Sequence, residues 1–126
     1  MMSRTRTLTA GLAAGRLLFG AGLIAVPEKL ASRWLGEDAA RPAVKIAIRA
    51  LGARDVALSA GTLACLGDGD ALRLWIAGAM VSDLCDVVST LVTPGSALPG
   101  NARWGTAVLG GGSALAGAAL LATETR

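Results

Sequence analysis

The chain of 126 residues is poor in the side chains that most often carry enzyme chemistry. It has no histidine and no tyrosine, one phenylalanine, three tryptophans and two cysteines. Histidine is the side chain that most readily exchanges a proton near neutral pH, and it is a frequent metal ligand. Any acid–base chemistry must therefore come from Asp, Glu, Lys, Arg, Cys or Ser.

Charge is also scarce, since charged residues make up 17% of the chain and the net charge is +3. The basic residues are spread over both ends and the loops, without the basic stripe of a nucleic-acid-binding protein, so we expect no nucleic-acid partner. Hydrophobic residues make up 53% of the chain. The length allows one domain, residues 1–126. What the chain offers in quantity is apolar sequence.

The apolar sequence is gathered in four segments, each long enough for a helix to cross about 30 Å of hydrocarbon. They cover roughly residues 8–26, 43–66, 72–92 and 104–123. Turn residues separate the last three segments. We therefore predict an all-α protein, a four-transmembrane-helix bundle. A soluble bundle is the alternative, but polar residues are too few to cover four solvent-facing helices.

Two further features concern the first third of the chain. Residues 28–35 predict a short amphipathic helix that lies at the membrane interface after the first span. Residues 1–25 resemble a signal peptide, but Arg16 interrupts the apolar run and no small-residue cleavage pattern is present. We expect this segment to remain as the first span.

Each span carries a seam of small or polar residues at helical spacing, which predicts one inward-facing side per helix. The seams are Gly11, Gly15 and Gly22; Gly52, Asp55, Ser59 and Thr62; Ala79, Asp83, Asp86, Thr90 and Thr93; and Thr106, Gly110, Ser113 and Gly117. Leu, Ile and Val on the other sides would contact lipid.

Charged residues interrupt three of the four spans, although a charge at the bilayer centre costs roughly 3 kcal/mol. Those that lie away from the span ends are Arg16; Arg49, Arg54 and Asp55; and Asp83 and Asp86. Intramembrane charges of this kind are rare and usually functional.

The tight turns set the depth of these charges. An antiparallel hairpin centred near Gly69 places Asp55 level with Asp83. The same register separates Cys65 from Cys85 by about 18 Å along the bundle. A disulfide needs Cα atoms within about 7 Å, so we predict two free thiols.

A second hairpin places Ser113 opposite Asp83 and Gly110 opposite Asp86. The first connection is longer, but it brings Arg16 to the same level. The sequence thus predicts a layer of carboxylates and guanidiniums near the bilayer midplane, facing small residues.

Acid–base catalysis is the function we expect of this layer. Two close carboxylates in a low dielectric do not both ionise easily, so one keeps a proton as a general acid while another acts as base. We expect Asp83 to be the acid and Asp86 or Asp55 the base, with Arg16 and Arg49 holding the anionic partner or a substrate oxygen. The reaction would be that of a cyclase, isomerase or hydrolase on a lipophilic small molecule, without cofactor or metal.

Three alternatives remain open. In the first, the charges form an ion-pair network that fixes helix register in a small accessory subunit, which could form homo-oligomers. The second is a small proton-coupled transporter, although small multidrug transporters place a Glu in the first span, where this chain has Arg16. Asp55, Asp83 and Asp86 could bind Mg²⁺. The residues after Asp86 do not continue as the Gly-x-x-Ala-Arg of CDP-alcohol phosphotransferases.

One motif resembles a known group of proteins. Residues 49–55, Arg-Ala-Leu-Gly-Ala-Arg-Asp, are followed by Leu58 and Gly61. They resemble the Arg-x-x-Gly-x-Arg-Asp signature of uncharacterised four-helix bacterial membrane proteins that are DoxX-like in layout. The resemblance implies a four-span bundle in the bacterial cytoplasmic membrane and singles out Arg49, Arg54 and Asp55. It implies no activity.

Overall fold

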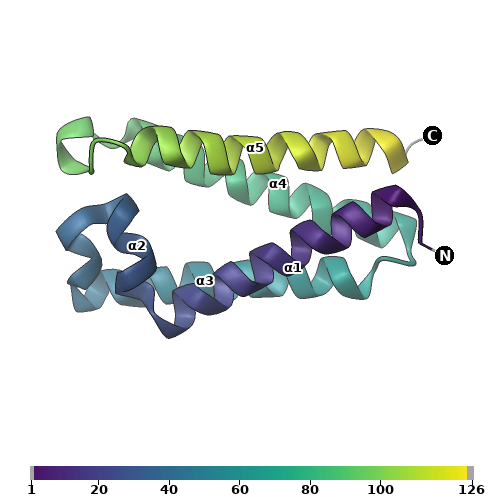
Figure 1. Ribbon diagram of the computed structural model, residues 1–126, viewed down its shortest axis with the longest axis horizontal. Helices are drawn as coiled ribbons and strands as arrows, with labels where there is room; N and C mark the ends of the chain where they lie inside the picture. Colours follow the sequence, from purple (N-terminus) through teal and green to yellow (C-terminus); the bar gives the residue numbers. More distant parts are fainter. Residues whose placement is uncertain (1, 125–126) are drawn as a thin grey trace.

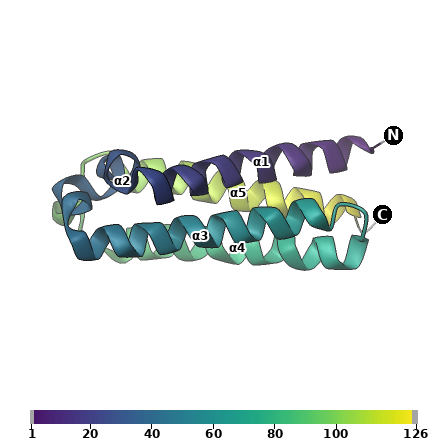
Figure 2. The same cartoon turned by 90° about the horizontal axis from the view of Figure 1, so that it is seen from below.

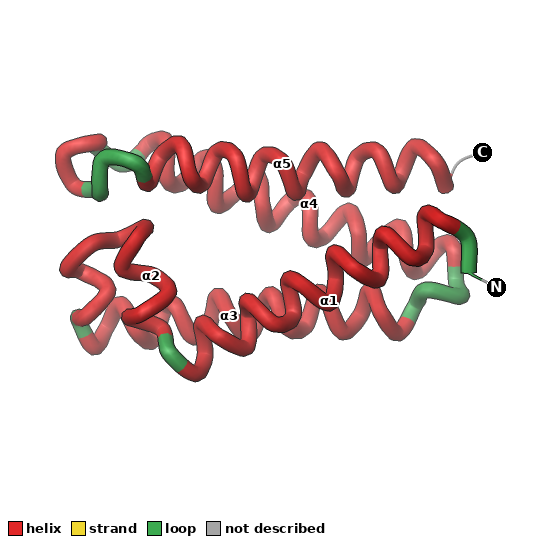
Figure 3. Tube along the Cα trace, viewed as in Figure 1, coloured by secondary structure: helices red, strands yellow, loops and turns green. Residues whose placement is uncertain are grey.

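The protein is mostly helical over residues 2–124, the part of the chain that the computed structural model describes, and short loops join the helices (Figure 3). Within that range it contains no strand, as predicted. The helices, coloured along the chain in Figure 1, are α1 (Arg4–Ala25), α2 (Pro27–Leu35), α3 (Pro42–Ala64), α4 (Gly69–Val92) and α5 (Ala102–Glu124), with short 3₁₀ turns at Gly36–Ala40 and Gly95–Ala97.

Capping and proline residues set the helix boundaries. The Ser3 side chain accepts a hydrogen bond from a first-turn backbone N–H of α1, and Asp68 does the same for α4. Pro27 and Pro42 occupy the first positions of α2 and α3, where a missing N–H costs nothing. These boundary residues lie outside the apolar runs, so the helices begin before the predicted spans. The difference is four residues in α1, one in α3, three in α4 and two in α5.

The long helices form two antiparallel pairs, α1 with α3 and α4 with α5, and α2 lies across one end (Figure 1, Figure 2). The first pair meets backbone to backbone at Gly20 and Gly52. A Cβ on Gly20 would lie 2.7 Å from the Gly52 carbonyl oxygen, and one on Gly52 would lie 2.5 Å from that of Gly20. Gly11 and Gly15 of the predicted α1 seam make no such close contact, because nothing lies within 4 Å of a Cβ on either residue.

The bundle exposes many large apolar side chains and buries several polar ones beside two small hydrophobic clusters. Large apolar side chains face outward, such as Leu18 at 71% and Leu115 at 74% exposed. The polar and charged side chains that are buried are Thr9, Asp55, Ser59, Thr62, Ser82, Asp83 and Thr90. Five of these lie on the seams that the sequence predicts to face inward. A soluble bundle has the opposite distribution, so this pattern suits a lipid surrounding.

In the described part of the chain, three helices are long and apolar enough to cross a membrane: Arg4–Ala25, Gly69–Val92 and Ala102–Thr123. They indicate an integral membrane protein. The prediction of four spans is not confirmed by the same criterion. Helix α3 has 23 residues, but it carries Lys45, Arg49, Arg54 and Asp55.

Candidate functional site

A cavity of about 1030 Å³ runs along the bundle and is lined by all five helices. Its wall includes Leu12 and Phe19 of α1, both 52% exposed, and Leu109 of α5, 76% exposed. These exposed lining residues place an opening of the cavity between α1 and α5. A molecule dissolved in the surrounding hydrocarbon could enter there without crossing water.

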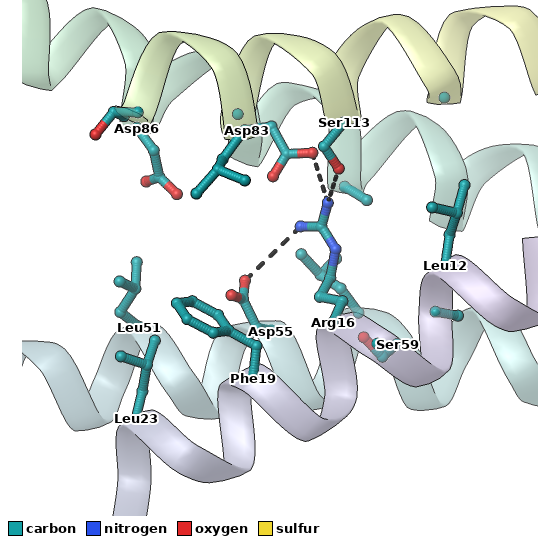
Figure 4. Close-up of a pocket in the computed structure, with 18 of the residues that line it drawn as sticks. Leu12, Arg16, Phe19, Leu23, Leu51, Asp55, Ser59, Asp83, Asp86 and Ser113 are labelled. Atoms are coloured by element: carbon teal, nitrogen blue, oxygen red, sulfur yellow. Dashed lines mark hydrogen bonds and ion pairs between the residues drawn. The ribbon is translucent and has the colours of Figure 1, made fainter. Parts of the chain in front are cut away.

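Arg16 reaches from α1 across this cavity (Figure 4). Its Nη2 donates to Asp83 Oδ2 at 2.5 Å and to Ser113 Oγ at 3.0 Å. Its Nη1 lies 3.8 Å from Asp55 Oδ1. One guanidinium thus connects α1 to α3, α4 and α5, and the two carboxylate side chains are 10% and 9% exposed.

Arg54 continues these contacts on the other side of Asp55. Its Nη1 and Nη2 donate to the two carboxylate oxygens of Asp86 at 3.0 and 2.8 Å. Its Nε and Nη2 donate to Asp55 Oδ1 at 3.3 and 3.1 Å. The paired contact with Asp86 has the fork geometry in which guanidinium and carboxylate bind most strongly.

The result is an unbroken chain of charges, Asp83–Arg16–Asp55–Arg54–Asp86, which we call the Asp/Arg network. Its three carboxylates face two guanidiniums, so one negative charge is in excess when all five groups are ionised. Four of the five side chains also line the cavity, Arg54 being the exception. The network therefore forms part of a wall that a bound molecule would contact.

The structure brings together most of the residues selected from the sequence. Asp55 and Asp83 meet through Arg16, and Ser113 joins them, as the level of the spans predicts. Gly110 also lies at this level, where it permits close packing of α5 on α4. A Cβ there would lie 2.8 Å from Val87 Cγ2.

Arg49 does not join the network, contrary to the prediction that it lies within reach of the carboxylates. Its Nε donates to the Ile24 carbonyl oxygen at 3.1 Å, at the end of α1. Five residues along a helix correspond to a rotation of about 140° beyond a full turn, which puts Arg49 and Arg54 on different faces. Without Arg49, three carboxylates are left with two guanidiniums.

The magnesium alternative finds no preformed site. Among residues 2–124, no group of three or more His, Cys, Asp or Glu side chains is close enough together to hold a metal ion. Asp55, Asp83 and Asp86 each accept hydrogen bonds from a guanidinium. The two cysteines are free, as predicted, with Cys65 half-buried and Cys85 exposed.

One contact of the site was missed by the sequence analysis. Trp34 of α2 donates from Nε1 to Thr90 Oγ1 at 3.0 Å, and Thr90 Oγ1 donates to the Asp86 carbonyl oxygen at 2.8 Å. Trp34 also lines the cavity. The position of Thr90 one turn after Asp86 on the α4 seam was the available signal.

Ser59 of α3 also lines the cavity. Its Oγ is buried and has no hydrogen-bond partner among the residues that the structure describes.

Comparison of the chain with protein-family models, with curated proteins and with solved structures gives no match.

Proposed function

We propose that the protein is a membrane-embedded acid–base enzyme that acts on a lipophilic molecule bound in the cavity between α1 and α5. The reaction class is that of a cyclase, isomerase or hydrolase. The observation that carries the proposal is the odd carboxylate of the Asp/Arg network, placed on the wall of a cavity open toward the lipid side.

The geometry favours Asp55 as the proton donor, in place of Asp83. Asp83 is engaged by Arg16 at 2.5 Å, and Asp86 is engaged by Arg54 through both oxygens. Asp55 shares both guanidiniums through Oδ1 alone, and within residues 2–124 its Oδ2 makes no hydrogen bond. An unpaired buried charge is costly, so the third carboxylate is neutralised most simply by a proton.

In this mechanism, Asp55 transfers its proton to a basic atom of the substrate, such as an epoxide, enol or carbonyl oxygen. The resulting Asp55 carboxylate is stabilised by Arg16 and Arg54. A proton released from the reaction product returns to Asp55, so that the proton count of the enzyme is unchanged after one cycle.

We also propose α3 as the fourth span of a bundle in the bacterial cytoplasmic membrane. Two of its charges, Arg54 and Asp55, lie in the network. Lys45 forms an ion pair with Glu28 of α2 at 2.8 Å, and Arg49 binds the end of α1. Each charge of α3 thus has a partner or lies toward the α2 end, where water and headgroups are near.

The test compares purified wild-type protein with the Asp55→Asn variant, each incubated with a bacterial lipid extract and followed by mass spectrometry. We expect the wild type to convert at least one lipid species and the variant to lose about 10²–10⁴ of that rate, the usual contribution of a positioned acid. Asp38→Asn is the matched control, because Asp38 is 61% exposed and outside the cavity. The control should keep the wild-type rate.

Two outcomes would overturn the proposal: no conversion by the wild type, or equal conversion by Asp55→Asn. The competing function is a structural ion-pair network, which the connection of four helices by Arg16 and its neighbours favours. That function predicts no conversion by any variant and a lower unfolding temperature for Asp55→Asn.

A further inference from the structure

The end of the cavity beside α2 differs in chemistry from the rest. Lys29 and Arg33, one turn apart on α2, both line the cavity and are exposed. Neither forms an ion pair within the described part of the chain. Asn101 and Ala102 at the start of α5 line the same end, so the positive end of the α5 helix dipole adds to this charge.

The opposite end of the cavity carries no charge within the described residues, and the hydroxyls of its threonines, Thr9 and Thr62, donate to carbonyl oxygens of their own helices. Ile76, Met80 and Leu120 line it, and Ile76 and Leu120 belong to a buried hydrophobic cluster. Asn101 and Leu120 both belong to the lining, and nineteen residues of helix separate them by about 28 Å. The cavity is therefore long, with a basic end and an apolar end.

We infer that the cavity binds a lipid with an anionic phosphate headgroup, with the phosphate held by Lys29 and Arg33 and the hydrocarbon chain lying along the cavity. The basic end matches the phosphate in charge, and the apolar end matches the chain. The lateral opening between α1 and α5 gives a route from the bilayer. A free phosphate ion would leave the apolar length of the cavity unfilled.

The contact between Trp34 and Thr90 fixes where the headgroup lies relative to the Asp/Arg network. Thr90 is about two turns beyond Asp83 on α4, or about 10 Å at 1.5 Å per residue. Trp34 lies next to Arg33 in α2 and contacts Thr90 directly. A phosphate at Lys29 and Arg33 thus leaves Asp83, and Asp55 at the same level, beside the chain. The group of the lipid that meets these two residues lies about 10 Å from the headgroup.

This inference deepens the proposed function by naming its substrate class, and it rests on the same cavity. Binding can be measured without turnover, so a failure of catalysis and a failure of lipid binding are separate results. The probe is radiolabelled palmitoyl lysophosphatidic acid, added to the full-length protein in a neutral detergent. Palmitoyl monoglyceride has the same chain without the phosphate, and inorganic phosphate tests the phosphate without the chain.

We expect Lys29→Gln/Arg33→Gln to weaken binding of the phosphorylated probe by about tenfold or more, since each basic residue near an anionic headgroup contributes several-fold. Arg33→Gln alone is compared with Arg41→Gln. Arg41 lies at the same end of the bundle, is similarly exposed and does not line the cavity. The Arg41→Gln substitution should change the affinity for the phosphorylated probe by less than about twofold.

The inference is overturned when the double variant binds as the wild type does, or when Arg41→Gln weakens binding as much as Arg33→Gln. If the wild type bound the monoglyceride as tightly as the phosphorylated probe, the phosphate would not contribute to binding. Displacement of the probe by inorganic phosphate at similar concentration would identify a site for the free ion instead.

Discussion

Arg54 binds Asp86 through both carboxylate oxygens, at 2.8 and 3.0 Å, and so joins α3 to α4 inside the bundle. The same guanidinium also donates to Asp55, its neighbour in sequence. Two carboxylates thus share this cation, and Asp55 also lies 3.8 Å from Arg16 Nη1. The Arg54 and Asp86 side chains are 31% and 27% exposed, which limits what their contact contributes to stability.

Replacement of Arg54 should therefore be destabilising. We expect Arg54→Met to lower the free energy of unfolding by about 1–3 kcal/mol, less than for a fully buried pair, because Asp86 loses its cation and Asp55 keeps only the contact with Arg16. Arg41→Met is the control, since the exposed Arg41–Asp38 pair contributes about 0–1 kcal/mol. Denaturant titration in mixed micelles measures both. Equal effects of the two changes would show that the network does not hold the helices together.

The backbone contact between α1 and α3 gives a second prediction. Gly20→Ala adds a Cβ that would lie 2.7 Å from the Gly52 carbonyl oxygen, and the helices must separate. We expect a loss of about 1–3 kcal/mol, as in other overpacked interfaces. Gly15→Ala is the control on the same helix, because nothing lies within 4 Å of a Cβ there. The Gly15 variant should be as stable as wild type or slightly more stable.

The cavity itself can be filled from α1. Gly15 lines the cavity and has open space around its Cα, so Gly15→Phe should place a ring inside it. We expect the affinity for palmitoyl lysophosphatidic acid to fall about tenfold or more, because a chain and a ring cannot share the space. Gly112→Phe is matched on α5, where the glycine is equally open but outside the cavity lining. Unchanged binding by Gly15→Phe would place the lipid elsewhere.

The distribution of basic residues predicts the orientation of the proposed four-span bundle. Within residues 2–124, six lie toward the α2 end and three toward the end that holds the start of α1. The first group is Lys29, Arg33, Arg41, Lys45, Arg49 and Arg103, and the second is Arg4, Arg6 and Arg73. Positive residues favour the cytoplasmic side, so α2 should be cytoplasmic.

Cysteine labelling in intact cells measures this orientation. In a Cys65→Ser/Cys85→Ser background, a membrane-impermeant maleimide should label Ser3→Cys and leave Ser32→Cys unlabelled until the cells are permeabilised. Both replaced serines are exposed at opposite ends of the bundle. The reverse labelling pattern would show that the charge distribution does not set the orientation.

The sequence predicted those parts of the structure that follow from helical period and from tight turns. The connection from α3 to α4 is short, so the level of Asp55 with Asp83 was fixed within about one turn. The seams predicted which sides face inward, since Gly52, Ser59 and Thr62 are buried. The short helix after the first span was also predicted, and it is α2.

The remaining features depend on contacts between residues far apart in sequence. Gly11, Gly15 and Gly20 all suit close packing on α1, and only the crossing point with α3 selects Gly20. Arg49 and Arg54 have the same chemistry, and the rotation between them around α3 separates their partners. The cavity results from the separation of α1 from α5, which no local pattern encodes.

The division of the network between the two helix pairs has a consequence for biogenesis. The α1–α3 pair supplies Arg16, Arg54 and Asp55, whereas the α4–α5 pair supplies Asp83 and Asp86. In the proposed four-span bundle, a nascent chain that has inserted only α1 and α3 would carry surplus positive charge in hydrocarbon. Insertion of α4 adds two carboxylates, which outweigh that positive charge. The two halves therefore carry network charges of opposite sign before they pack together.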